Sequence, residues 1–148
     1  MPLLDFLPFS FTISQTFLQP PLMETALQLN VTLPNQPGSL ARMSDMLRAA
    51  DVNIEALFSE EKGEESVVHV IVDDVETAKI VLKQVDHVTT TDVLAIKVKN
   101  KPGAIAQIAR MCAGANINIC HIYATSLGKE AMVYLSVDDL EKAKEVLK

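Results

Sequence analysis

The sequence has no tryptophan, only two cysteines and five glycines, and aromatic residues make up 5% of its 148 positions. The cysteines, Cys112 and Cys120, are too few for a disulfide framework, and their spacing is not that of a zinc or redox motif. We expect both to be buried, reduced thiols, as in a cytoplasmic protein. No uninterrupted apolar run approaches the roughly 20 residues that a membrane-spanning helix needs. A membrane partner is therefore not expected.

Positive charge is also scarce, because 13 Lys and Arg residues face 19 Asp and Glu residues and the formal net charge is −6. An acidic chain with scattered lysines is a poor binder of phosphate backbones, which disfavours nucleic acid as a partner. Hydrophobic residues make up 49% of the chain, so a buried core is expected and disorder is excluded. The composition indicates one ordinary domain or two small ones.

Residues 1–22 differ from the rest of the chain in holding four of the seven prolines, four of the five phenylalanines and one charged residue. They lack the basic start and continuous apolar stretch of a secretory signal. Met23 precedes the first well-patterned strand, so residues 1–22 form an N-terminal extension whose status stays open. Either they lie upstream of the biological start, or the strand-like Phe11–Ser14 packs onto the body.

The remainder of the chain is an internal repeat. A shift of 65 positions aligns Leu29–Lys83 with Leu94–Lys148 without a gap. About 21 of the 55 aligned positions are identical, which is well beyond what composition alone gives. The identical positions include an Asn-x-Pro-Gly segment, an Asn-Ile pair and an Asp-Asp pair in each copy. Two copies of one module follow.

Within a copy, the hydrophobic periodicity alternates between that of a strand and that of a helix, in the order strand, helix, strand, strand, helix, strand. Ser39 is the expected N-cap of the first helix, and Asp73 or Asp74 that of the second. This order predicts an α+β fold of two tandem ferredoxin-like βαββαβ modules, each an antiparallel sheet with both helices on one face. The predicted elements of copy one are strand, helix, strand, strand, helix and short strand at residues 27–33, 40–50, 52–57, 68–72, 78–82 and 86–91.

We expect the two domains at residues 26–91 and 92–148. The second lacks its last strand, because the chain stops at Lys148 directly after the second helix. The vacant position lies beside the strand Leu94–Val98, where an unpaired edge favours pairing, and Phe11–Phe17 is one candidate to fill it. The helix-free sheet face carries Val and Ile and also predicts a partner surface.

The repeated motifs resemble the hallmark of the ACT domain family. Segments Leu33–Leu40 and Val52–Ile54 carry it in copy one, and Val98–Ile105 and Ile117–Ile119 carry it in copy two. The resemblance covers about residues 26–148. It implies that each module senses a small molecule, usually an amino acid, and is attached to or assembled with a metabolic enzyme. It also implies that two modules pair side by side through their second strands into an eight-stranded sheet, with the ligand at their interface.

The loop between the first strand and the first helix suits a small anion on physical grounds. Pro37 fixes φ and removes a competing donor, while Gly38 lets the backbone approach a ligand closely. Free N–H groups at the start of the helix favour a carboxylate, and an Asn side chain offers both a donor and an acceptor. Asn before Pro is also common in ordinary turns, where its side chain binds only local backbone.

The resemblance to the serine-binding regulatory domain of phosphoglycerate dehydrogenase implies ligand contacts from asparagines crossed between modules, Asn35 with Asn118 and Asn100 with Asn53. That family has a His two residues before the first Asn, where this chain has an apolar residue in both copies. This replacement weakens the case for serine and makes a larger apolar amino acid at least as strong a candidate for the ligand. The full set of candidate ligand-binding residues is Asn35, Pro37, Gly38, Ser39, Leu40, Asn53, Ile54, Asn100, Pro102, Gly103, Ala104, Ile105, Asn118 and Ile119.

No metal, cofactor or catalytic site is expected. None of His69, His87 and His121 has a second ligand at metal-binding spacing, and the Asp-Asp pairs occupy positions that suit helix N-caps. The three arginines lie within the first helices, and no nucleophile, base and anion site converge. The protein is therefore not expected to be an enzyme.

The function predicted from the sequence is that of a regulatory sensor. It binds a free amino acid at the interface between ACT modules and controls a separate metabolic enzyme by allostery. The alternative is a ligand-free protein–protein assembly module of an enzyme of amino-acid metabolism. A homodimer is expected on either interpretation, because pairing the two copies leaves an apolar sheet face and an unpaired edge.

Overall fold

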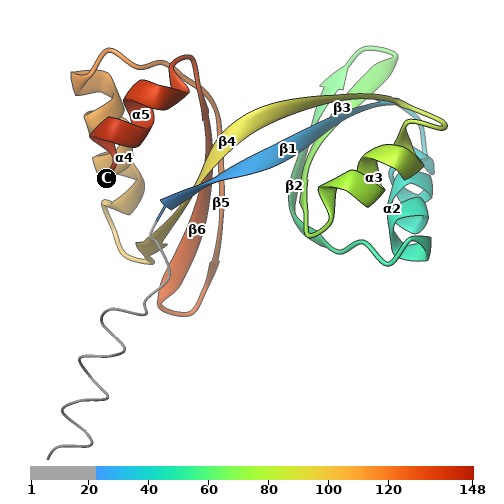
Figure 1. The fold of residues 1–148 in the computed structure, drawn as a ribbon, viewed down its shortest axis with the longest axis horizontal. Helices are drawn as coiled ribbons and strands as arrows, with labels where there is room; N and C mark the ends of the chain where they lie inside the picture. Colours follow the sequence, from blue (N-terminus) through green and yellow to red (C-terminus); the bar gives the residue numbers. More distant parts are fainter. Residues whose placement is uncertain (1–22) are drawn as a thin grey trace, which may run out of the picture.

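A computed structural model describes residues 23–148, which form one six-stranded antiparallel sheet and four helices (Figure 1). The strand order across the sheet is β2-β3-β1-β4-β6-β5. The strands are β1 (Met23–Pro34), β2 (Ile54–Lys62), β3 (Glu65–Val72), β4 (His87–Lys99), β5 (Ile119–Leu127) and β6 (Glu130–Val137). The helices are α2 (Ser39–Ala49), α3 (Val75–Leu82), α4 (Ala104–Gly114) and α5 (Leu140–Val146). The N-terminal extension lies outside the described residues.

Local sequence explains where the helices begin. Helices α2 and α4 follow Gly38 and Gly103, whose φ angles of 93° and 91° are left-handed and suit glycine. Ser39 is therefore the first residue of α2 and not its N-cap, because the Pro-Gly turn places the glycine at the helix entry. Asp74 and Asp139 cap α3 and α5, and each side chain accepts a hydrogen bond from the backbone N–H three residues later.

The predicted fold class is confirmed, but the two modules share strands. The first half of β4 ends module one and its second half begins module two, so the predicted boundary after residue 91 lies inside β4. The first part of β1, Met23–Leu27, pairs antiparallel with Asp92–Ile96 of β4. This part of β1 occupies the strand position that was expected to be vacant in module two. The other candidate for that position, Phe11–Phe17, lies outside the described residues.

The modules pair through β1 and β4, whereas pairing through their second strands was expected. Strands β2 and β5 form the two opposite edges of the sheet. The chain therefore has a six-stranded sheet, and the prediction of eight strands was wrong for the single chain. The reason is length, because β1 and β4 contain 12 and 13 residues and each serves both modules.

Each module has its own core between its helices and its half of the sheet. A third cluster of buried residues lies on the helix-free side and contains Ile71, Val93, Ala95 and Tyr134. The sheet is strongly twisted, with α2 and α3 outside one half and α4 and α5 outside the other (Figure 1). The helix-free faces of the two halves contact each other. The apolar face predicted from the sequence is thus covered by the other module.

Cys112 is buried in α4, as expected, but Cys120 is exposed on β5. The pairing of β5 with β6 shifts register between Ile119 and His121, which leaves Cys120 outside the regular ladder. The prediction of two buried thiols was therefore wrong for Cys120. Among residues 23–148, no helix combines the length and the apolar character needed to span a bilayer.

Candidate functional site

The first loop of each module is tied to the hairpin turn of the same module. Asn35 Nδ2 donates a hydrogen bond to the Gly63 carbonyl at 2.8 Å, and Asn100 Nδ2 donates to the Gly128 carbonyl at 3.0 Å. This is the local turn role that the sequence left open as an alternative. Within residues 23–148 the side-chain oxygen of neither asparagine accepts a hydrogen bond. Both oxygens therefore remain available to a ligand.

The second asparagine of each module is held through its backbone. Asn53 N donates to Asp73 Oδ1 at 2.9 Å, and Asn118 N donates to Asp138 Oδ1 at 3.0 Å. The first aspartate of each Asp-Asp pair thus fixes the entry to the second strand, while the second aspartate caps a helix. The side chains of both asparagines are exposed.

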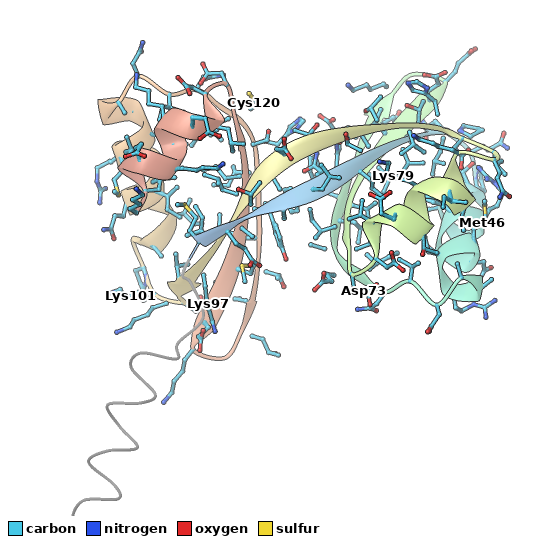
Figure 2. All side chains as sticks on the ribbon, in the orientation of Figure 1. Met46, Asp73, Lys79, Lys97, Lys101 and Cys120 are labelled. Atoms are coloured by element: carbon cyan, nitrogen blue, oxygen red, sulfur yellow. The ribbon has the colours of Figure 1, made fainter. Side chains whose placement is uncertain are left out.

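The two asparagines of one module lie at opposite ends of its second strand. Figure 2 shows this for module two, where Lys101 follows Asn100 at one end and Cys120 lies two residues after Asn118 at the other. No hydrogen bond within residues 23–148 joins the side chains of the predicted crossed pairs. Because β2 and β5 are the opposite edges of the sheet, a single chain does not pair them as neighbours.

A shallow pocket of about 170 Å³ opens beside the first loop of module two. Three candidate ligand-binding residues, Asn100, Ala104 and Ile105, line it. The end of β4, the start of α4 and the edge strand β5 form its walls. The complete lining is Val98, Lys99, Asn100, Lys101, Ala104, Ile105, Ala124, Thr125, Ser126 and Ala131.

The pocket is positively charged. Lys99 and Lys101 line it, and within residues 23–148 neither forms an ion pair. Helix α4 starts there without a side-chain cap, so its first free N–H groups add partial positive charge. The corresponding positions of copy one are Pro34 and Gln36. The arrangement favours a carboxylate, and it does so more strongly in module two than in module one.

Each module exposes two large apolar side chains, one at the start of its first helix and one on its edge strand. Leu40 of α2 and Ile105 of α4 are 45% and 43% exposed, and Leu57 of β2 and Ile122 of β5 are 43% and 40% exposed. Leu40 and Ile105 are equivalent positions of the repeat, as are Leu57 and Ile122, because in each case the two residues are 65 positions apart. Each module therefore presents a helix start, an unpaired edge strand and two large apolar side chains on its surface.

A polar cluster in the contact between the modules was missed from the sequence. His69 Nε2 lies 2.7 Å from Glu60 Oε2, and His121 Nε2 of the other module lies 3.8 Å from Glu60 Oε1. Burial lowers the pKa of His69, while the hydrogen bond to His69 lowers the pKa of Glu60. The one available signal was a histidine within the otherwise apolar run of β3.

Comparison with known proteins agrees with this architecture. The family model described as an ACT domain pair matches residues 24–148. Among solved structures, the chain is similar to protein BT0572 from Bacteroides thetaiotaomicron, with 28% identity and a TM-score of 0.80 over 86% of this chain and 89% of that one. No curated protein sequence matches the chain.

More distant similarity extends to two aspartate kinase regulatory subunits. The ligand-free subunit from Thermus thermophilus is 17% identical, with a TM-score of 0.65 over 84% of this chain and 91% of that one. The subunit from Thermus flavus is 16% identical, with a TM-score of 0.59 over 84% and 92%. At this identity the likeness concerns the fold. The family match, which covers most of the sequence, shows that the chain belongs to the ACT domain pair family.

Proposed function

We propose that the protein is a regulatory sensor that binds a free amino acid at an interface between ACT modules and controls a separate metabolic enzyme. The observation that carries the proposal is the pocket of module two. Lys99, Lys101 and the start of α4 suit the carboxylate of an amino acid. The unbonded side-chain oxygen of Asn100 suits its ammonium group. A molecule with both charges on one carbon fits this combination.

We further propose that a second chain completes the pocket. Antiparallel association of two edge strands from different chains would place the first loop of one module beside the second asparagine of the other. The crossed pairs, Asn35 with Asn118 and Asn100 with Asn53, would then form between chains. Such a homodimer would bury the exposed apolar residues of β2 and β5 and the starts of α2 and α4.

The partner enzyme is proposed to belong to amino-acid metabolism. Its support is the similarity to chains named as regulatory subunits of aspartate kinase. We propose that the protein acts in the cytoplasm and catalyses no reaction itself. Around the pocket the described residues provide cations and an amide but no nucleophile with an adjacent base.

The test is a thermal-shift screen of the twenty amino acids, followed by calorimetry on any that respond. A ligand at about 100 times its Kd adds roughly 2.7 kcal/mol to the free energy of unfolding, which raises the midpoint measurably. The double variant Lys99→Ala, Lys101→Ala should weaken binding at least tenfold. The control Lys83→Ala, Lys142→Ala removes the same charge from exposed sites elsewhere and should leave the affinity unchanged.

The second candidate function is a ligand-free assembly module. The four exposed apolar side chains on α2, α4, β2 and β5 favour it, since they call for a partner whether or not a ligand binds. Twenty flat responses at millimolar amino acid from a chain that still dimerises would favour this alternative. Equal loss of affinity in both lysine double variants would contradict the pocket assignment.

A further inference from the structure

Three potential metal ligands from both modules meet where the helix-free faces of the sheet touch. Glu60 and His69 lie on β2 and β3 of module one, and His121 lies on β5 of module two. One oxygen or nitrogen atom from each residue lies within 4.8 Å of the other two. Phe58 stacks on the His69 ring at a centroid distance of 4.4 Å and contacts the His121 ring edge at 5.2 Å. The aromatic contacts hold both imidazoles in place.

Both ring nitrogens of His69 face oxygen atoms. Nδ1 lies 2.7 Å from Asn30 Oδ1, and Nε2 lies 2.7 Å from Glu60 Oε2. The Asn30 amide is oriented by its neighbours, because its nitrogen donates to the Thr91 hydroxyl and its oxygen accepts from Gln28 Nε2. Nδ1 also lies 3.2 Å from Gln28 Nε2, so the two contacts of Nδ1 favour different tautomers. In the tautomer whose Nδ1 hydrogen bonds to Asn30, the Nε2 lone pair of the neutral ring faces the Glu60 carboxylate. Two electron-rich atoms this close need a cation between them, a proton or a metal ion.

The placement of His121 favours a metal ion. A shared proton involves only Glu60 and His69, but the Nε2 atom of His121 also approaches the same carboxylate, at 3.8 Å. Two imidazoles, one carboxylate and an open position form a donor set typical of Zn²⁺. A zinc-binding histidine commonly donates its other ring N–H to a fixed acceptor, and Asn30 Oδ1 lies 2.7 Å from His69 Nδ1 in position for that role. The Glu60 side chain is 35% exposed and has room to move outward and admit the ion.

The cluster is not a by-product of the repeat. The positions of copy two that correspond to Glu60 and His69 are Thr125 and Tyr134, and the position of copy one that corresponds to His121 is Ala56. The equivalent contact on the other side of the module interface thus has a threonine and a tyrosine where this side has a glutamate and a histidine. Burial of His69, which is 5% exposed, is costly unless its polar atoms are satisfied. A binding role accounts for this polar replacement on one side only.

We propose that Glu60, His69 and His121 bind a divalent transition-metal ion of the Zn²⁺ class that links the two modules. Imidazole nitrogen selects Zn²⁺ and similar ions over Mg²⁺ and Ca²⁺, which prefer oxygen ligands. Because the ligands come from both modules, the ion binds only the arrangement in which the helix-free faces are in contact. It therefore stabilises that arrangement. This proposal is independent of amino-acid binding at the pocket of module two.

The test is calorimetric titration of the metal-free full chain with ZnCl₂, with Co²⁺ absorption as a report on coordination. We expect one Zn²⁺ per chain, and affinities reduced at least tenfold in both His121→Ala and Glu60→Gln. His87→Ala is the matched control, because it removes an exposed histidine of β4 outside the cluster and should bind like the wild type. Cys120→Ser should also retain binding, which excludes the exposed thiol beside His121 as the ligand.

Three results would overturn the proposal. One is the absence of Zn²⁺ binding at millimolar concentration, and another is equal affinity in the wild type and His121→Ala. The third is Mg²⁺ binding as tight as Zn²⁺ binding. If His121→Ala fails to fold, Glu60→Gln decides the matter, because glutamine keeps the size of the side chain and can still hydrogen-bond to His69. Undiminished Zn²⁺ affinity in that variant would exclude the site.

Discussion

Leu27 of β1 and Asp92 of β4 face each other as a cross-strand pair, and they are also equivalent positions of the internal repeat. The operation that superposes one copy on the other exchanges these two residues, so a local two-fold axis passes between them. The same axis relates β1 to β4. Each of these strands gives one half to each module. The two modules are therefore joined by two strands that run without a break from one into the other, although each module has its own core.

This sharing predicts that the chain unfolds in one cooperative transition. Leu29→Ala and Leu94→Ala remove equivalent, fully buried side chains from the cores of modules one and two. Each should lower the free energy of unfolding by about 2–5 kcal/mol. In urea, circular dichroism and tyrosine fluorescence should give coincident curves for both variants and for the wild type. Two separated transitions, with each variant moving only one of them, would show that the modules fold independently.

The sequence predicted the modules because their signals are local or repeated. Asn35 and Asn100 recur in phase, and Asp74 and Asp139 lie where helix caps belong, so the element order followed from spacing. The pairing of β1 with β4 was not predictable in this way. The predicted first strand covers residues 27–33, and the residues before Leu27 show no alternation that would extend the strand or indicate which edge it joins.

The candidate site was predicted in part for a similar reason. Loop residues such as Asn100 and Ile105 are neighbours in sequence, and they do line the pocket. The cluster of Glu60, His69 and His121 depends on the twist that brings β2 of one module to β5 of the other. Each histidine taken alone lacks metal-binding spacing, so no local pattern indicates the cluster.

The Asp74 cap predicts a pH dependence. Hydrogen bonds from the Thr77 hydroxyl and backbone N–H lower the pKa of Asp74. A carboxylate with a depressed folded pKa contributes stability above its unfolded pKa of about 3.9, and that stability is lost as the pH falls through the folded value. The wild type should therefore exceed Asp74→Ala in stability near neutral pH by a margin that narrows in acid. Asp74→Asn keeps a capping oxygen that does not titrate, so the difference in stability between Asp74→Asn and Asp74→Ala should change less with pH. A wild-type margin that widened in acid would contradict this account.

Gly38 at the start of α2 predicts a conformational cost of substitution. Its φ of 93° is left-handed, and a Cβ there would meet no atom within 4 Å, so strain and not a clash decides the effect. Gly38→Ala should lower the free energy of unfolding by about 1–2 kcal/mol. Gly38→Asn should cost less, because asparagine tolerates this region better. Chemical denaturation of both variants makes the comparison, and equal costs would argue against backbone strain.

The exposed apolar residues of the edge strands predict a homodimer that a charge disrupts. Leu57→Glu and Ile122→Glu place a carboxylate on β2 and β5, where the proposed interface would bury it without a partner. Sedimentation velocity should show a dimer for the wild type and a monomer for either variant. Ile80→Glu is the control, because Ile80 is 67% exposed on α3 and away from both edges. A wild-type monomer, or a dimer unaffected by both edge variants, would exclude this interface.

Tyr123 predicts how the contact between the modules responds to alkaline pH. Its hydroxyl donates to Gln28 Oε1 at 2.9 Å, and burial raises the pKa of Tyr123 above its ordinary value of about 10. The stability that depends on the neutral phenol is therefore present below about pH 10 and lost as the pH rises toward the folded pKa. Near neutral pH, Tyr123→Phe should cost about 1–3 kcal/mol, because the buried Gln28 oxygen loses its donor.

Above about pH 10 the cost of Tyr123→Phe should shrink. The Tyr123 phenol ionises in the unfolded wild type but stays neutral in the fold, so the wild type loses stability, whereas phenylalanine does not titrate. Urea denaturation of both proteins at neutral and alkaline pH measures the difference. Tyr134→Phe is a useful comparison. Burial raises the pKa of Tyr134 as well, but its hydroxyl makes no hydrogen bond within residues 23–148. Tyr134→Phe should gain stability relative to the wild type at alkaline pH, as Tyr123→Phe does, but should lose none at neutral pH. If the difference in stability between Tyr123→Phe and the wild type stayed constant with pH, Tyr123 would not be the source of the effect.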